Sequence, residues 1–310
     1  MTLCTGLPAR PLILVEWRNS VNFLISCNDA YAMPTEVMLT SLLTVNPQGS
    51  HTVYILESEL SENAFRRIKS CAESLGARCR DLHIREDCFA SSRTRSYISK
   101  ETYYRLLAAK FLPQDLNRVL WLDSDMIIRD SIRELYDQPF EGKAVVACGY
   151  GAPMQELIGR NAQNLGMNDP EHYFNAGVML INLPLWRENM TQNRIQEGMD
   201  RIQGSDSLFP GQDLTNLLMD GSVRMEDYRR FNSMVHCISG AGDLQYALEN
   251  AAVVHFSGEA KPWKFNDIHF ADEWMQWYRK CFGENAHLKR MSYFRLKELF
   301  KEALMKSALP

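Results

Sequence analysis

Short apolar, β-branched runs alternate along the chain with longer amphipathic stretches. The strand-like runs are Val21–Cys27, Thr52–Leu56, Arg118–Leu122, Ala144–Cys148, Gly177–Ile181 and Ala252–Phe256. The helix-like stretches are Thr35–Leu43, Glu62–Leu75, Thr102–Leu112, Leu185–Ile202 and Gln212–Met219. Alternation of this kind is typical of βαβ units. The pattern therefore predicts an α/β fold with a Rossmann-like, open and mostly parallel sheet flanked by helices.

The character of the sequence changes near Phe270, where aromatic and then basic residues become frequent. We therefore expect a main domain over residues 1–269 and a C-terminal helical, basic and aromatic appendage over residues 270–310. From His287 onward there are six basic residues against two acidic ones. The apolar residues of this segment recur at helical spacing: Tyr293, Leu296, Phe300 and Leu304. Such a segment forms either an amphipathic helix on an anionic membrane surface or a helix packed against the main domain.

Composition and charge narrow the range of functions. The chain has 310 residues, of which 45% are hydrophobic, which is enough to bury one large core. A charged fraction of 23% and a net charge of -4 indicate no broad basic surface, so we expect no nucleic-acid partner. The eight cysteines form no C-x-x-C pair, and the first residues carry no signal-peptide pattern. We expect reduced thiols and a cytoplasmic location, with any membrane contact peripheral and at the inner face.

Two carboxylates follow one of the predicted strands. Asp123 and Asp125, separated by Ser124, come directly after Arg118–Leu122 and precede another apolar run. In open α/β sheets, ligands bind at the carboxyl ends of the strands. Two carboxylates in apolar surroundings repel each other unless a cation lies between them, which favours a divalent metal. The alternative is a turn in which one Asp caps the backbone and the other faces water.

A second apolar run carries a histidine. His255 lies in the run Ala252–Phe256, and Gly258 and Lys261 follow closely. An imidazole beside carboxylates suits manganese or a similar first-row ion. Gly258 allows the backbone to approach a phosphate closely, and Lys261 supplies a positive charge to neutralise it. A lone histidine after a strand is more often structural, but these neighbours favour a site for metal and phosphate.

These residues resemble those of a known family, the retaining glycosyltransferases of sequence family 8, which include lipooligosaccharide galactosyltransferases and, more distantly, glycogenin. The resemblance rests on five segments in order: Phe23–Tyr31, Thr102–Leu106, Leu120–Asp125, Tyr173–Asn182 and His255–Trp263. It implies a GT-A fold for the main domain and a nucleotide-sugar donor that is usually UDP-linked. It also implies Mn²⁺, or another divalent cation such as Mg²⁺, bridging the donor diphosphate to the protein.

The resemblance implies roles for individual residues as well. Asp123, Asp125 and His255 match the metal ligands. Gln212 matches the residue beneath the reacting anomeric carbon, and the adjacent Asp213 is a second candidate for a catalytic role. The residues that match donor contacts are Asn28, Asp29, Arg105, Asp123, Ser124, Asn175, Ala176, Gly177, Gln212, Gly258 and Lys261. The chain departs from the family pattern near the donor base and the donor sugar, at Asn28, Ala30 and Gly211.

The implied activity is transfer of glucose or galactose from a UDP-sugar to a saccharide, lipid-linked or glycoprotein acceptor, with retention of configuration. The position of Gln212 offers no carboxylate nucleophile, so a front-face substitution fits best, and a double displacement through Asp213 stays open. A non-catalytic sugar-nucleotide-binding protein and a metal-dependent phosphohydrolase also stay open, although the second usually needs more acids or histidines for two metals. A dinucleotide-dependent dehydrogenase is disfavoured, because no G-x-G-x-x-G follows the first strand.

Overall fold

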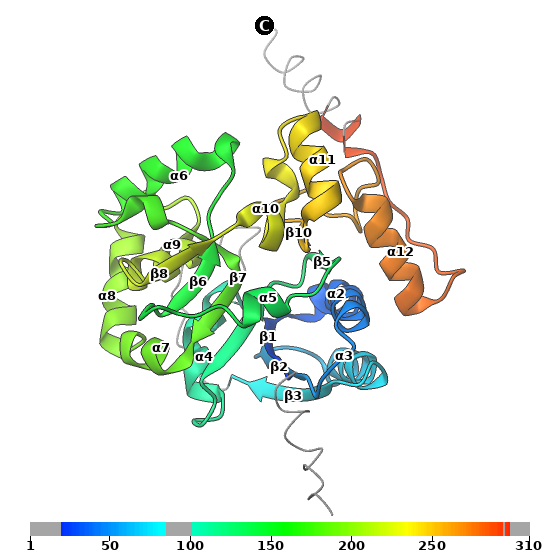
Figure 1. Ribbon diagram of the computed structural model, residues 1–310, viewed down its shortest axis with the longest axis horizontal. Coiled ribbons are helices and arrows are strands. Elements are labelled where there is room, and N and C mark those ends of the chain that lie inside the picture. The colour runs from blue at the N-terminus through cyan, green and yellow to red at the C-terminus, as the bar shows by residue number, and fades with distance from the viewer. Residues whose placement is uncertain (1–19, 85–100, 294, 298–310) are drawn as a thin grey trace, which may run out of the picture.

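A seven-stranded sheet organises the protein (Figure 1). The computed structural model describes residues 20–84, 101–293 and 295–297. The sheet order is β3-β2-β1-β4-β7-β6-β8, and β7 alone among these strands runs antiparallel to its neighbours. The strands are β1 (Asn22–Ser26), β2 (Thr52–Glu57), β3 (Arg78–His83), β4 (Arg118–Leu122), β6 (Val145–Cys148), β7 (Asn175–Asn182) and β8 (Val223–Glu226). The predicted α/β fold with a mostly parallel sheet is confirmed.

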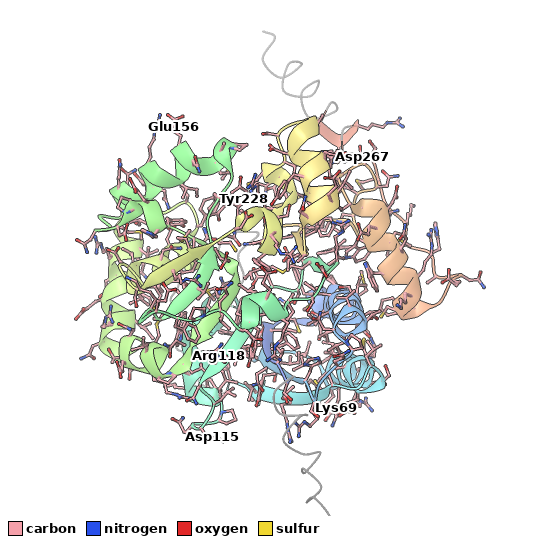
Figure 2. The ribbon with its side chains drawn as sticks, viewed as in Figure 1. Lys69, Asp115, Arg118, Glu156, Tyr228 and Asp267 are labelled. Carbon is pink, nitrogen blue, oxygen red and sulfur yellow. The ribbon has the colours of Figure 1, made fainter. Side chains whose placement is uncertain are left out.

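Each face of this sheet carries a hydrophobic core covered by helices, and successive side chains of a strand contribute to opposite cores. In β1, Phe23 and Ile25 join a core with α2 (Ala32–Val45) and α3 (Glu62–Ser74). Leu24 points the other way and joins a second core. The helices of that second core are α4 (Glu101–Phe111), α6 (Ala152–Asn164), α7 (Leu183–Asn189), α8 (Gln192–Gln203) and α9 (Pro210–Leu218). Charged side chains lie on the outside of these layers. Figure 2 labels three exposed examples, Lys69, Asp115 and Glu156.

A small second sheet continues from the large one. Its order is β5-β10-β9, with β10 antiparallel to β5 and parallel to β9. A third core under this sheet includes Val254, Phe256 and Trp274, together with Val37 of α2. The other strands and α-helices of the described residues are β5 (Met126–Ile128), β9 (Ser233–Met234), β10 (Val253–His255), α5 (Arg133–Tyr136), α10 (Tyr228–Phe231), α11 (Ala241–Asn250) and α12 (Ala271–Phe282).

The structure corrects the sequence prediction in one helix and adds elements that it missed. All six predicted strands are present, with bounds that differ by at most two residues. The single helix predicted over Leu185–Ile202 is wrong: α7 ends at Asn189 and α8 begins at Gln192. The side chain of Thr191 accepts a hydrogen bond from Arg194 N and caps α8, which sets the break. The elements that the pattern did not predict include β3, β8, α6 and α11.

The C-terminal part is helical in α12, as expected. Beyond it, the centroids of the Tyr293 and Phe265 rings lie 4.8 Å apart, and Arg290 donates to the carbonyl oxygens of Pro262 and Ala271. These contacts hold the start of the basic segment against the preceding residues. Phe300 and Leu304 lie outside the described residues, so the amphipathic helix and the boundary at 269/270 stay predictions. No helix in the described part of the chain is long and apolar enough to cross a membrane.

Candidate active site

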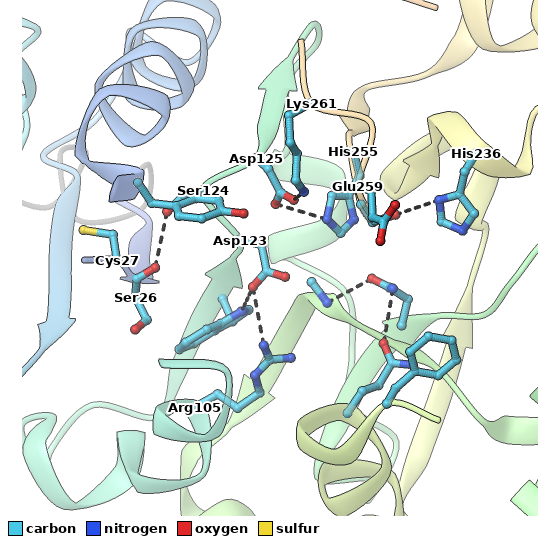
Figure 3. A pocket seen from close by; sticks show the side chains of 18 of the residues that line it. Ser26, Cys27, Arg105, Asp123, Ser124, Asp125, His236, His255, Glu259 and Lys261 are labelled. Atoms are coloured by element: carbon cyan, nitrogen blue, oxygen red, sulfur yellow. Dashed lines mark hydrogen bonds and ion pairs between the residues drawn. The ribbon is translucent and has the colours of Figure 1, made fainter. Parts of the chain in front are cut away.

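A cavity of about 1000 Å³ opens at the carboxyl ends of β1, β4 and β10, beside the start of β7 (Figure 3). The predicted site residues that line it are Asn28, Arg105, Asp123, Ser124, Asp125, Asn175, Gly177, Gln212, His255, Gly258 and Lys261. The predicted residues Asp29, Ala176 and Asp213 are not part of its lining. Segments far apart in the sequence therefore meet at one edge of the sheet, as the strand pattern predicts.

Asp123 and Asp125 lie in the short connection where β4 of the large sheet passes into β5 of the small one. The backbone N–H of Asp123 donates to the Gly177 carbonyl at 2.9 Å, which ties this connection to β7. Its Oδ1 accepts a hydrogen bond from Trp121 Nε1 at 2.8 Å. Asp125 is buried rather than solvated. The Asp123 side chain is 28% exposed and lines the cavity, and the two carboxylates contact the side chains of Trp121, Arg105, His255 and Lys261. A turn in which one of these carboxylates caps the backbone therefore does not describe this segment.

His255 reaches the two acids through strand register. β10 pairs with β5 so that His255 lies opposite Met126, the residue after Asp125. The ring Nε2 lies 3.2 Å from Asp125 Oδ1, and the ring Nδ1 lies 2.8 Å from Asn232 Oδ1. The ligand atoms of Asp123, Asp125 and His255 all lie within 4.8 Å of one another.

Gly177 allows this cluster to form because it has no side chain. A Cβ atom at this position would lie 2.4 Å from His255 Cε1 and 3.0 Å from Asp123 Oδ2. Both approaches are closer than ordinary van der Waals contact. Sequence reasoning expected Gly177 beside the donor sugar, and the structure adds that the glycine leaves room for two predicted metal ligands.

Lys261 is buried and forms an ion pair with Asp125 (Figure 3). Its Nζ donates to Asp125 Oδ2 at 2.5 Å and to the Phe256 carbonyl at 2.8 Å. Burial opposes the charge on both groups, but their mutual attraction outweighs it. The pKa of Lys261 is raised, and Lys261 together with His255 holds the pKa of Asp125 well below its usual range. Both groups are therefore ionised at neutral pH.

Two carboxylates and one imidazole are a ligand set that suits a divalent first-row cation. Within the part of the chain that the structure describes, these three residues are the one group of acids, histidines and cysteines with such geometry. Asp125 is already ionised, as a metal ligand must be. The Asn232 side chain orients the His255 ring from the side opposite the acids. The residues present therefore fit the divalent cation that the sequence predicts.

Arg105 is buried beside Asp123. Its Nη2 lies 3.6 Å from Asp123 Oδ1, and its Nη1 donates to the Ala176 carbonyl at 2.7 Å. The guanidinium also lies over the Trp121 ring, 5.0 Å from its centroid. Burial lowers the pKa of Arg105, and the Asp123 carboxylate opposes that effect. Arg105 thus fixes Asp123 and presents a positive group to the cavity.

Gln212 lies within a buried network of amides and phenols. Its Oε1 accepts from Ala176 N at 3.1 Å and from the Tyr150 hydroxyl at 2.9 Å. Its Nε2 donates to the hydroxyls of Tyr150 and Tyr173 at 2.7 and 3.0 Å. Burial raises the pKa of both tyrosines, so their hydroxyls stay protonated. These contacts hold the Gln212 side chain at one place on the cavity wall.

Asp213 points away from the cavity, although it follows Gln212 directly. One oxygen accepts from Asn161 Nδ2 and from the Tyr173 hydroxyl, and the other accepts from Ser207 Oγ and Phe209 N. The residue has no exposed surface. A carboxylate in this position is not placed to attack an anomeric carbon, which corrects the expectation that Asp213 acts directly. It supports Tyr173 and the start of α9 instead.

Comparison with known proteins identifies the family of this chain. The family model described as Glycosyl transferase family 8 matches residues 22–267. The chain belongs to this family. It is therefore a glycosyltransferase, as the motif resemblance implies.

Relatives within family 8 cover most of the chain. It is 27% identical to the lipopolysaccharide 1,3-galactosyltransferase of Salmonella typhimurium, over 78% of this chain and 70% of that protein. It is 25% identical to the lipopolysaccharide 1,2-glucosyltransferase of Escherichia coli, over 73% of this chain and 68% of that protein. The crystal structure of the galactosyltransferase LgtC with donor and acceptor sugar analogues superposes with a TM-score of 0.71 at 26% identity, covering 84% of this chain and 96% of that one. The GT-A fold is therefore confirmed.

Two residues expected to contact the donor in this family 8 chain have other partners. Asp29 Oδ1 accepts from Ser61 N at 2.8 Å, at the start of α3, so its carboxylate faces away from the cavity. Ala176 takes part in the site through its backbone: its carbonyl accepts a hydrogen bond from Arg105, and its N–H donates to Gln212. Asn28 does line the cavity, and its side-chain oxygen also accepts from Tyr31 N at 3.2 Å.

Sequence reasoning missed several residues at this site, and three of them hold predicted site residues in place: Tyr150, Tyr173 and Asn232. Tyr150 follows β6 between Gly149 and Gly151, in a stretch without acidic residues. Tyr173 falls at the edge of the segment that resembles the family, but nothing in its spacing marks it as a partner of Gln212. Asn232 is an isolated polar residue between α10 and β9. No pattern in the sequence pairs it with His255.

Proposed function

We propose that this family 8 glycosyltransferase transfers glucose or galactose from a UDP-hexose, with retention of the anomeric configuration. The observation that supports this proposal most strongly is convergence: Asp123, Asp125, His255, Lys261 and Gln212 line one cavity of about 1000 Å³. The relatives named as lipopolysaccharide galactosyltransferase and glucosyltransferase support a hexose donor.

In this proposal the donor lies across the edge of the sheet. Its base lies beside Asn28 at the end of β1, and its diphosphate lies against a divalent cation, Mn²⁺ or alternatively Mg²⁺, held by the Asp123–Asp125–His255 cluster. Gly258 has φ +86° with open space around it, which lets the backbone approach the diphosphate closely. The hexose lies between Asn175, Gly177 and Gln212.

Sugar transfer requires stabilisation of the leaving diphosphate, on which negative charge grows. A divalent cation, when bound at the cluster, supplies most of that stabilisation as a Lewis acid. The Lys261 ammonium adds a second positive charge in the same wall. Gln212 lies beneath the anomeric carbon with its amide held by two phenols, and Asp213 is turned away. A front-face substitution by the acceptor hydroxyl is therefore favoured, with its proton passing to a diphosphate oxygen.

The proposed acceptor is a saccharide, with a lipid-linked saccharide favoured over a glycoprotein because the named relatives act on lipopolysaccharide. We place the enzyme in the cytoplasm, with the basic segment from His287 as a peripheral contact to the inner face of the membrane. A two-metal phosphohydrolase is disfavoured, since the described residues contain a single candidate metal cluster.

The proposal is tested with purified protein and a panel of UDP-, GDP- and CMP-sugars, without acceptor. We expect release of UDP from UDP-glucose, UDP-galactose or both in the presence of Mn²⁺, and no release in chelator. Turnover of GDP- or CMP-sugars alone would show that the donor class is wrong. Tight binding of a UDP-hexose without hydrolysis or transfer to any saccharide would indicate a sugar-nucleotide-binding protein instead.

A further inference from the structure

A buried chain of hydrogen bonds joins the candidate metal ligand His255 to Gln212. His255 Nδ1 lies 2.8 Å from Asn232 Oδ1, and Asn232 Nδ2 donates to Asn175 Oδ1 at 2.9 Å. Asn175 Nδ2 in turn donates to Gln212 Oε1 at 3.2 Å. Asn232 is 0% exposed and Asn175 is 6% exposed, so water does not replace these partners. Two buried amides thus connect a metal ligand with the residue proposed to lie beneath the anomeric carbon.

The direction of this chain is fixed by two backbone N–H groups, which can only donate. Gly177 N donates to one end of the Asn175 amide at 3.0 Å, so that end is the oxygen. Ala176 N donates to Gln212 at 3.1 Å, so the atom of Gln212 that faces Asn175 is also an oxygen. The Asn175 amide therefore has its oxygen toward Asn232 and its nitrogen toward Gln212. The orientation of the Asn175 side chain therefore follows from the positions of the backbone N–H donors.

The same reasoning extends to His255. Because the Asn175 oxygen faces Asn232, the atom that Asn232 presents to it is the nitrogen, and its oxygen must face the imidazole. An amide oxygen only accepts, so the His255 nitrogen that faces it, Nδ1, carries a proton. Nε2 is then the ring nitrogen that faces Asp125 and the cluster, and it is the one that can offer a lone pair to a metal.

Without Asn232, the ring would have a competing arrangement. Asp125 Oδ1 lies 3.2 Å from Nε2, close enough to accept a proton carried there. A ring protonated on Nε2 would lose the lone pair that binds metal and would also occupy an oxygen of a second ligand. The Asn232 oxygen prevents this arrangement by offering the proton an acceptor on the far side of the ring.

We propose that Asn232 is a positioning residue for this active site: it holds His255 in the Nδ1–H tautomer, which keeps Nε2 available to a divalent cation, and it links His255 to Asn175. The proposal rests on the proposed metal site. The backbone N–H groups of Ala176 and Gly177 set the direction of every hydrogen bond in this network. Metal binding and the placement of Gln212 therefore depend on one network. Loss of one hydrogen bond in a buried network of this kind also weakens the others.

The most direct test observes the tautomer in the metal-free wild-type protein. Nitrogen-15 NMR of selectively labelled histidine, assigned with His255→Gln, distinguishes protonation on Nδ1 from protonation on Nε2. We expect Nδ1–H for His255. A ring without a proton on Nδ1 in the folded, metal-free protein would overturn the proposal, and this result does not depend on any variant of Asn232 folding.

A second test uses variants of Asn232 and measures binding of Mn²⁺ alone by electron paramagnetic resonance. Asn232→Leu removes both hydrogen bonds and keeps a side chain branched at Cγ, and we expect Mn²⁺ to bind about 10- to 100-fold more weakly, the usual effect of losing the partner of a metal-bound histidine. Asn232→Asp keeps an acceptor for Nδ1–H but cannot donate to Asn175. We expect it to restore most of the Mn²⁺ affinity while turnover stays low, because Asn175 loses a hydrogen-bond partner and positions Gln212 less firmly.

A matched control separates this role from a loss of stability. Asn46 is also buried, donates to the Leu42 carbonyl and accepts from Ile132 N, but it is remote from the cavity. Asn46→Leu should lower the melting temperature without changing Mn²⁺ affinity. If Asn232→Leu binds Mn²⁺ as tightly as the wild type, Asn232 does not position His255, and the proposed function is unaffected. Failure of the wild-type protein to bind Mn²⁺ would instead refute the metal site on which both depend.

Discussion

Replacing Gly177 with alanine is the smallest change that should dismantle the metal cluster. The substitution adds one methyl group and no charge, at a residue that contacts both His255 and Asp123. The added Cβ would lie 2.4 Å from His255 Cε1, whereas carbon atoms in contact are normally about 3.5–4.0 Å apart. The ring or the β7 backbone must therefore move by roughly 1 Å.

A displacement of that size exceeds what a metal site tolerates, since ligand distances hold to within about 0.2 Å. We expect Gly177→Ala to weaken Mn²⁺ binding by at least about 100-fold, the upper end of the range for loss of a residue that supports a metal ligand, because here a ligand itself is moved. Overpacking should lower the free energy of unfolding by about 1–3 kcal/mol, which leaves a folded protein to study.

The assay combines Mn²⁺ binding, thermal unfolding and release of UDP from a UDP-hexose. Gly159→Ala is the matched control, because Gly159 lies within α6 and a Cβ there meets nothing within 4 Å. The control should bind Mn²⁺ normally and gain about 0.5–1 kcal/mol of stability from alanine in a helix. A Gly177→Ala protein that binds Mn²⁺ and turns over its donor like the wild type would refute this reading of the cluster.

Three further predictions concern other parts of the site and the C-terminal segment. Asp125→Asn removes the charged partner of the buried Lys261, so the folded protein should be less stable, and turnover should fall at least about a hundredfold. A chelator should lower the turnover of the wild type to a similar extent, and full activity in either case would remove the metal from the mechanism. Lys261→Met leaves the buried Asp125 without its partner, so the metal-free protein should lose about 3–5 kcal/mol of stability, and Mn²⁺ should raise its melting temperature more than that of the wild type; equal melting temperatures for the two metal-free proteins would contradict the pairing. Truncation after Ala286 should abolish flotation with anionic vesicles without loss of donor hydrolysis, and equal flotation of both proteins would exclude this segment as the anchor.

The main strands and the metal cluster could be predicted from the sequence, because each leaves a local signal. The strands are apolar runs of the right length. Asp123 and Asp125 follow one such run and His255 ends another, at the edge where ligands bind. β3 gave no such signal, since Arg78–His83 is a largely polar edge strand. The break at Thr191 was missed because α7 and α8 are both amphipathic, and a cap between them does not interrupt the apolar spacing.

The supporting residues could not be predicted, because their partners are distant in the sequence. Asn232 and His255 meet only through the pairing of β9 with β10. Asp213 was assigned a direct role because it adjoins Gln212, yet neighbouring residues of a helix point about 100° apart. One of the two therefore faces the cavity while the other faces the core. A motif match identified Gln212, which faces the cavity, but gave no information on the direction in which Asp213 points.

The central claim is that Asp123, Asp125 and His255 hold a divalent cation against the donor diphosphate. Its most direct test is a crystal structure of the protein grown with Mn²⁺ and UDP, with anomalous diffraction recorded at the manganese absorption edge. We predict an anomalous peak bonded to side-chain atoms of all three residues, His255 Nε2 among them, and to diphosphate oxygens. UDP bound in the cavity without such a peak, or manganese bound only elsewhere, would contradict the account.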